Sequence, residues 1–158
     1  MGLLVDIRES WANYLLTDQA SGSAAYFAAD PAIPVYTEKL KTIDQAITNA
    51  KTTIGLNVVI VTVIAKEAQN QIRGLYFKNI LAIARVMESP RVNKSGVCAS
   101  DLAESVAWFT RKFTYNGESP LLLENISLAP TKDGITYDVI YKLQGGVFTA
   151  PTRPAVQP

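Results

Sequence analysis

The stretch Val58-Val-Ile-Val-Thr-Val-Ile-Ala65 decides the fold class of this chain. Its residues are mostly β-branched and apolar, without the alternation of a strand that faces water on one side. Such a run predicts a strand that is covered on both faces. A second run, residues 75–88, is rich in Leu, Ile, Val, Phe and Tyr. We expect the two strands to pair antiparallel around a long polar loop at residues 66–74, and Ser89-Pro90 to end the second strand.

Helical periodicity precedes this hairpin. Residues 3–17 predict a helix, because four apolar residues recur at every fourth position and form one stripe, namely Leu3, Ile7, Trp11 and Leu15. Residues 18–34 break the pattern with Ser-Gly-Ser and two prolines, which predicts a loop or an extended connection. In this segment, Tyr26 and Phe27 are candidates for anchoring the chain to a surface.

Two further helices are predicted, one on each side of the hairpin. Thr37 suits the N-cap of the helix that precedes the first strand, and Gly55 suits the left-handed position after its end. The other helix begins at Ser100 or Asp101, after a turn-rich loop. Its buried stripe is expected to consist of Leu102, Val106, Phe109 and Phe113.

Two more strands, residues 121–128 and 135–143, complete the pattern. The order α-α-β-β-α-β-β predicts an α+β fold, with a largely antiparallel four-stranded sheet and helices packed on one face. Residues 1–144 are expected to form a single domain. Residues 145–158 contain three prolines near the end and no periodicity, so we expect an extended Pro-rich arm.

The charge balance, the cysteine count and the length of the apolar runs exclude several classes of function. The 158 residues carry 15 basic and 14 acidic side chains, with no run of three like charges, so the basic excess typical of duplex-binding or membrane-surface proteins is missing. The single cysteine, Cys98, excludes an intramolecular disulfide and fits a reducing cytoplasm. The sequence shows neither a secretory signal nor an apolar run long enough for a membrane span, and we expect a soluble, unprocessed chain.

The sequence contains few residues that could form a catalytic site. The chain has no histidine, which excludes the Ser-His-Asp, Cys-His and His-metal arrangements. Two carboxylate pairs remain, Asp101 with Glu104 and Glu124 with Asp138, and structural roles explain both better than catalysis. No phosphate-binding loop occurs. We therefore expect no enzyme, no metal and no cofactor.

Other features favour assembly. The sheet strands are unusually apolar for a monomer, and residues 66–74 and 145–158 extend from them as polar segments. The arm carries Val147, Phe148 and Val156, which can dock on a neighbouring molecule, although a frayed terminus is an equally good reading. A scattered basic group is better explained as solvated side chains than as a phosphate-binding patch, and it comprises Arg85, Arg91, Lys94, Arg111 and Lys112.

Three stretches carry a resemblance to a known protein family. The first runs from Ile33-Pro-Val-Tyr-Thr-Glu-Lys39 to Gly55-Leu-Asn-Val-Val-Ile-Val-Thr62. The second is Ala82-Ile-Ala-Arg-Val-Met-Glu-Ser-Pro-Arg-Val-Asn93, with the helix opening at residues 99–107. The third is the closing hairpin, residues 123–128 and 135–141. Together they resemble the phage tail terminator (tail completion) family over residues 34–146; the segment before residue 33 and the arm do not align with the family.

The resemblance implies a structural protein of the virion, assembled in the host cytoplasm and placed at the tail–neck junction. It implies a homo-hexameric ring that caps the tail tube, contacts the tail tube protein and a neck or head completion protein, lets DNA pass, and has no active site or membrane contact. Candidate interface residues are Lys66, Gln69, Asn70 and Arg73 in the hairpin loop, Arg91, Asn93 and Lys94 after it, and Phe148 and Arg153 in the arm. The alternatives are a head completion or neck connector protein, a generic protein-binding module and, less favoured, a tail tube protein or a carboxylate enzyme.

Overall fold

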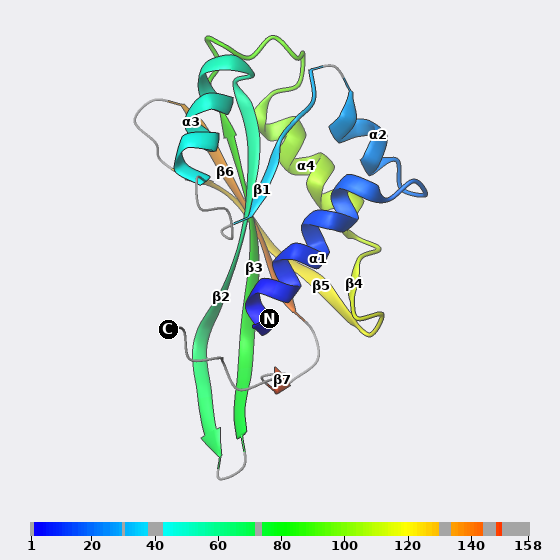
Figure 1. Cartoon of the computed structure of the whole chain (residues 1–158), viewed down its shortest axis with the longest axis vertical. Helices are drawn as coiled ribbons and strands as arrows, with labels where there is room; N and C mark the ends of the chain where they lie inside the picture. Colours follow the sequence, from blue (N-terminus) through cyan, green and yellow to red (C-terminus); the bar gives the residue numbers. More distant parts are fainter. Residues whose placement is uncertain are drawn as a thin grey trace, which may run out of the picture.

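The computed structural model describes residues 2–29, 31–37, 43–71, 74–129, 134–143 and 148–149. At residues 43–44, 64–71, 74–79 and 148–149 it describes the backbone path alone. One curled sheet carries the described helices, and a long hairpin extends from its lower end (Figure 1).

The sheet has the strand order β1-β2-β3-β6-β5-β4. Its bounds are β1 Val35–Thr37, β2 Leu56–Gln71, β3 Gly74–Glu88, β4 Thr114–Tyr115, β5 Ser119–Ala129 and β6 Ile135–Leu143. The described pairs of neighbours run antiparallel, except for β1 and β2, which run parallel. The α+β class is therefore confirmed. The four strands expected from the sequence are β2, β3, β5 and β6, and the prediction missed the short strands that extend them.

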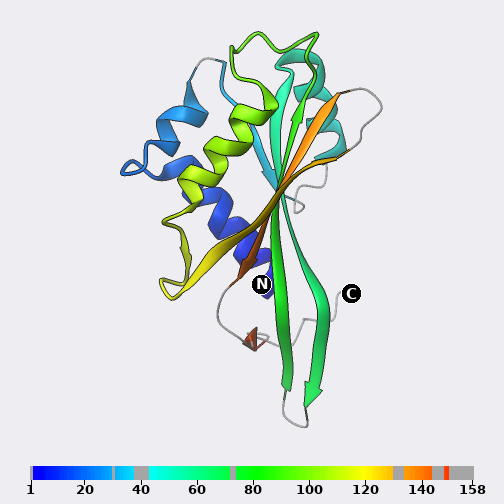
Figure 2. The same cartoon turned by 180° about the vertical axis from the view of Figure 1, so that it is seen from behind.

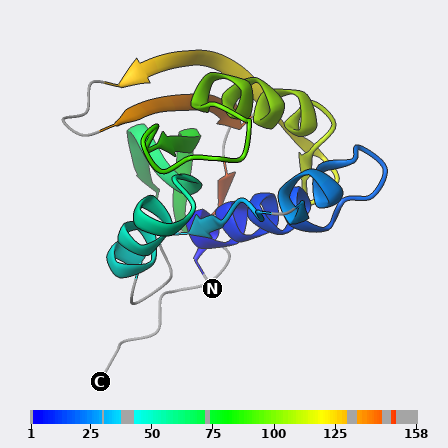
Figure 3. The same cartoon turned by 90° about the horizontal axis from the view of Figure 1, so that it is seen from above.

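The helices are α1 Leu3–Thr17, α2 Ser23–Ala28, α3 Ile43–Thr53 and α4 Ala99–Thr110. Three of them, α1, α2 and α4, fill the concave side of the sheet, whereas α3 lies outside the curve beside β2 (Figure 3). The expectation that the helices pack on one face is therefore wrong. Because β2 is apolar on both faces, it needs cover on both.

Of the described helices, none combines the length and apolar character that a membrane crossing requires.

Burial along β2 reflects this two-sided cover. Val58 and Ile60 belong to the main core and are fully buried. Val59 points the other way and is buried outside that core, as is Ala50 of α3. Gly55 joins α3 to β2 with a φ of +80°, and its N–H donates to the carbonyl of Ala50 at 2.7 Å. The left-handed residue predicted at this position is confirmed.

Trp11 lies at the centre of the main core with no exposed surface. Its ring meets Tyr141 edge-on with centroids 5.2 Å apart, and its Nε1 donates to Thr110 Oγ1 at 3.0 Å. This hydrogen bond satisfies the one polar atom of an otherwise apolar side chain. Both predicted apolar stripes are buried here, that of residues 3–15 and that of residues 102–113.

The segment between α1 and β1 differs from the prediction. Residues 18–34 contain the short helix α2, where a loop or extended connection was expected. The anchoring role of the two aromatic residues is confirmed, because Phe27 is almost fully buried and the Tyr26 ring lies 5.2 Å from that of Phe109. Thr37 ends β1, and its hydroxyl donates to Glu9 at 2.8 Å. The start of the helix that Thr37 was predicted to cap lies outside the described residues.

The predicted polar loop at residues 66–74 is wrong as well. β2 continues to Gln71 and β3 starts at Gly74, so the two strands stay paired almost to the turn. Figure 2 shows this hairpin extending well beyond the helices. Along this part of the hairpin the described backbones of β2 and β3 pair from Glu67 with Lys78 to Gln71 with Gly74. A two-residue strand, β7 Phe148–Thr149, lies in the predicted arm and pairs with β3 at Tyr76 and Phe77; the rest of the arm is outside the described residues.

Candidate assembly surfaces

One acid of each candidate carboxylate pair has structural contacts. Arg85 binds the carboxylate of Asp138 through two hydrogen bonds of 2.9 and 3.1 Å. Asp101 lies in the first turn of α4 and accepts hydrogen bonds from the backbone N–H and the thiol of Cys98, which is the N-cap. Among the residues that the structure describes, no three Cys, Asp or Glu side chains gather as a metal site.

One outer edge of the sheet is open along β2. The parallel strand β1 covers β2 at Val58, Val59 and Ile60. Beyond that point, from Val61 to Gln71, no described strand pairs with β2 on this side. We refer to these eleven residues, 61–71, as the β2 edge. Its backbone N–H and C=O groups alternate between β3 and the open side, as in any edge strand.

The opposite edge is open along β5. The short strand β4 pairs with β5 at Ser119 and Pro120 alone. The nine residues from Leu121 to Ala129, which we name the β5 edge, have no described strand partner on their outer side. Three leucines on this edge are exposed, with exposed fractions of 45%, 51% and 63% for Leu122, Leu123 and Leu128. Natural proteins usually protect long edge strands with charged residues, prolines or β-bulges; this edge carries one charged residue, Glu124, at a bulge and leaves the three leucines exposed.

The convex face of the sheet adds to this apolar surface. One row across the strands contains Val63, Leu81, Lys142 and Leu122, of which Val63, Lys142 and Leu122 are exposed. The next row contains Ile83 and Ile140, both half-buried. Helix α3 contacts the sheet at β2. Apolar side chains thus lie on the convex face and at both edges, with the charged Lys142 between Leu81 and Leu122.

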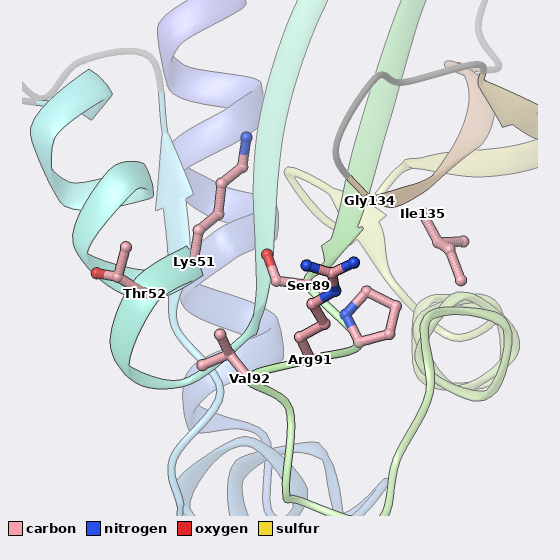
Figure 4. A pocket seen from close by; sticks show the side chains of 8 residues that line it. Lys51, Thr52, Ser89, Arg91, Val92, Gly134 and Ile135 are labelled. Carbon is pink, nitrogen blue, oxygen red and sulfur yellow. The ribbon is translucent and has the colours of Figure 1, made fainter.

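A shallow cleft of about 780 Å³ lies at the end of the molecule opposite the hairpin tip. Lys51 of α3 and Arg91 of the loop after β3 stand on its walls, with Ser89 and Ile135 nearby (Figure 4). Of the described residues that line it, two are cationic and none is acidic. The cleft is therefore suited to an anionic group, such as a carboxylate on a neighbouring protein.

Internal hydrogen bonds shape the loop that forms one wall of this cleft. Glu88 is buried and accepts hydrogen bonds from Asn93 Nδ2 at 2.8 Å and from the N–H of Ala99 at 2.9 Å. Asn93 also donates to the carbonyl of Val97 and accepts from Ser95. The Asn93 side chain is therefore committed to holding the loop.

Helix α4 presents a second exposed surface. Trp108 is 59% exposed, and the guanidinium of Arg111 stacks on its ring at 3.5 Å from the centroid. A smaller hollow beside it is lined by Tyr26, Asp101 and Glu104, among others. Aromatic and acidic groups of this kind favour a cationic partner.

The predicted interface residues fall in different places. Lys66, Gln69 and Asn70 lie on the β2 edge, where their backbone is described, and Phe148 lies in β7. Arg91 lines the cleft, and Lys94 is exposed in the same loop. Arg73 and Arg153 lie outside the described residues.

Sequence reasoning missed the exposed side chains of β5 and α4. Residues 121–128 were predicted as a strand, but the exposure of Leu122, Leu123 and Leu128 was not. The run of three consecutive leucines at 121–123 was the available signal, because one face of a strand cannot bury all three. Trp108 had no comparable signal, since it is exposed on a helix that is otherwise largely apolar.

Neither the family models nor the curated proteins searched contain a match to this chain.

Proposed function

We propose that this protein is a structural subunit of a long-tailed phage, forming a ring that caps the tail tube and offers a surface to the neck. The observation that supports it best is the pair of open sheet edges on opposite sides of one sheet. Two different edges on one molecule favour a heterologous contact, in which one patch meets another patch on the next copy. Repeated by rotation, such a contact closes into a ring.

The exposed side chains support the same proposal. Leu122, Leu123 and Leu128 on the β5 edge, together with Val63 on the convex face, are a liability for a monomer in water. Burial between copies removes that liability. The projecting hairpin of β2 and β3 extends away from the helices and is suited to contact a further ring above or below.

The carboxylate contacts also fit a structural role. Asp138 is held by Arg85, and Asp101 is held at the start of α4. Each candidate carboxylate pair thus has one member with a local structural partner, although Asp101 and Glu104 line one small hollow beside α4. We infer that the protein acts by binding other proteins rather than by catalysis.

The test is deletion of the gene from the phage genome that carries it, followed by negative-stain imaging of the lysate. We expect abnormally long tails beside DNA-filled heads without tails, and normal particles when the protein is supplied from a plasmid. Tails of normal length that fail to join heads would assign the protein to the neck instead. Intact infectious particles would contradict a role in the virion.

A further inference from the structure

We propose that the β5 edge of one copy pairs antiparallel with the β2 edge of the next copy, with Ser127 opposite Val63, so that the sheets join around the ring. The proposal rests on the ring function above and names its subunit contact. It draws on four features of the described residues: strand direction, the position of β1, the two β-bulges and the charged positions.

Strand direction fixes the sense of pairing. Each step from β2 through β3 and β6 to β5 reverses direction, so β5 runs opposite to β2 within one chain. Neighbouring copies in a ring of six differ by a rotation of about 60°. Since a rotation of that size is smaller than the reversal between β5 and β2, we expect the two strands to keep their opposite sense across the contact. The contact between β5 and the β2 edge of the next copy is therefore antiparallel, which is the pairing with the better hydrogen-bond geometry.

The position of β1 limits the register. β1 occupies the outer side of β2 as far as Ile60, where it pairs through Thr37. Of the described residues, none pairs with β2 on this side beyond Ile60, so we place the start of the incoming strand at Val61. Placing Ala129, the last residue of β5, opposite Val61 brings all nine residues of the β5 edge onto β2 and sets Ser127 opposite Val63.

The bulges support this register independently. β5 has one extra residue between Leu123 and Asn125, and β2 has one extra residue between Ile64 and Glu67. With Ser127 opposite Val63, the bulged position Glu124 faces Lys66. The two β-bulges then lie opposite one another, so the same pairing register holds on both sides of them. A slip of two residues would separate the bulges and break the pairing twice.

The same register places residues of the same sheet face opposite one another across the contact. Val63 and Ser127 both occupy convex-face rows of the sheet, together with Leu81 and with Asp138 respectively. Beyond the bulges, Leu123 and Glu67 both occupy positions of the concave face, since their partners are Tyr141 and Lys78. A shift by one residue would turn every side chain to the wrong face. The opposite charges at positions 66 and 124 also complement each other.

Disulfide trapping tests this contact. In a Cys98→Ser background, Val63→Cys and Ser127→Cys are placed in the same chain and the protein is oxidised mildly. Residues directly opposite in antiparallel strands have Cβ atoms about 4.5–5.5 Å apart, close enough for a disulfide. Within one chain these positions are separated by β3 and β6, about 14 Å at the usual strand spacing. Any disulfide therefore links two copies.

We expect a ladder of covalent multimers from the double variant and none from either single variant. Asn125→Cys and Ala129→Cys, each combined with Val63→Cys, shift the register by two residues and should link more weakly. Leu128→Cys faces the other side of the sheet and should not link to Val63→Cys. Dimers from Ser127→Cys alone would show two-fold pairing of β5 with itself and would overturn the proposal.

Native mass spectrometry of the protein without new cysteines separates this proposal from the function on which it rests. Rings that give no cross-link at any of the three β5 positions overturn the edge contact and leave the ring function standing. A chain that stays monomeric at high concentration and gives no cross-link counts against both.

Discussion

Two neighbouring leucines on β5 have opposite surroundings. Leu121 is 5% exposed and packs in the core, whereas Leu122 is 45% exposed on the convex face. The same contrast runs along β2, where Ile60 is fully buried and Val63 is 40% exposed. The core between the sheet and its helices is thus filled within one chain, while the edges and the convex face carry apolar side chains that the fold of one chain leaves exposed. Substitutions on the two sides should therefore have different consequences, for stability in one case and for assembly in the other.

The largest effect on stability is expected at Trp11. Trp11→Ala removes a fully buried ring and its hydrogen bond to Thr110, and should lower the free energy of unfolding by about 3–5 kcal/mol. Trp108→Ala is the matched control, because that ring is 59% exposed and contacts Arg111. Its cost should be about 0.5–1 kcal/mol. Urea denaturation of both variants makes the comparison, and equal losses would contradict the assignment of Trp11 to the core.

Alkaline pH should also destabilise the concave side. Burial, with the hydrogen bond to Asp6, raises the pKa of Tyr115 to about 12, and burial raises the pKa of Tyr141 to about 12. An unfolded tyrosine titrates near pH 10. This contribution to stability is therefore complete below pH 10 and is lost as the pH rises from about 10 to about 12. The unfolding free energy of the Tyr115→Phe/Tyr141→Phe variant should fall less over that range; an equal fall would show that other groups are responsible.

Replacement of Glu88 should also lower the free energy of unfolding, by less than replacement of Trp11. Glu88→Ala leaves the N–H of Ala99 and the amide of Asn93 without their acceptor in a buried place. We expect a loss of about 1–3 kcal/mol in the free energy of unfolding. Glu118→Ala, on the exposed turn before β5, should change it by less than about 0.5 kcal/mol. Thermal or urea unfolding measures both, and a neutral Glu88→Ala variant would refute the role of Glu88 in the loop.

The edge leucines should show the reverse behaviour. Leu122→Lys with Leu128→Lys places two charges on the β5 edge, where they disfavour pairing with another strand. The free energy of unfolding of the monomer should change by about 0.5 kcal/mol or less per site, while multimers disappear from native mass spectra. Leu16→Lys, an equally exposed leucine on α1, should leave assembly intact. Loss of assembly in the control as well would point to a nonspecific effect of charge.

The smallest effect is expected from the opposed charges. Lys66→Glu or Glu124→Lys alone places like charges opposite one another and should weaken each contact by about 0.2–1 kcal/mol. The double exchange should restore the wild-type concentration dependence of assembly. Additive weakening in the double variant would show that the two positions do not meet.

The contrast between the buried core and the open edges also explains which helices and strands could be predicted from the sequence. The stripes of α1 and α4 were predictable, because burial against one core imposes a helical period on Leu3 to Leu15 and on Leu102 to Phe113. The hairpin pairing was predictable for the same reason. The strand at residues 66–71 was not, because this largely polar segment lacks the apolar pattern from which a strand is predicted. The pairing of Thr37 with Ile60 depends on a partner twenty-three positions away, which no local pattern reveals.

The candidate surfaces were harder to predict than the fold. Lys66, Gln69 and Asn70 were chosen as loop residues and lie on an open strand edge instead. Asn93 was chosen with Arg91 and Lys94 in the loop after the hairpin, but its amide holds that loop together. Leu122 is exposed because it points to the convex face, and Leu123 because no described strand lies on the outer side of β5 there. The run of three leucines indicated that not all are buried, but not which edge of the sheet they occupy.

The most direct test combines the deletion with the edge variant. Phage lacking this gene is complemented with wild-type protein or with the Leu122→Lys/Leu128→Lys variant, after the variant has been shown to fold, and tail lengths are measured in the lysate. The account predicts normal tails with the wild type, and abnormally long, headless tails both without complementation and with the edge variant. Normal infectious particles from the edge variant would contradict the claim that the open sheet edges build the ring.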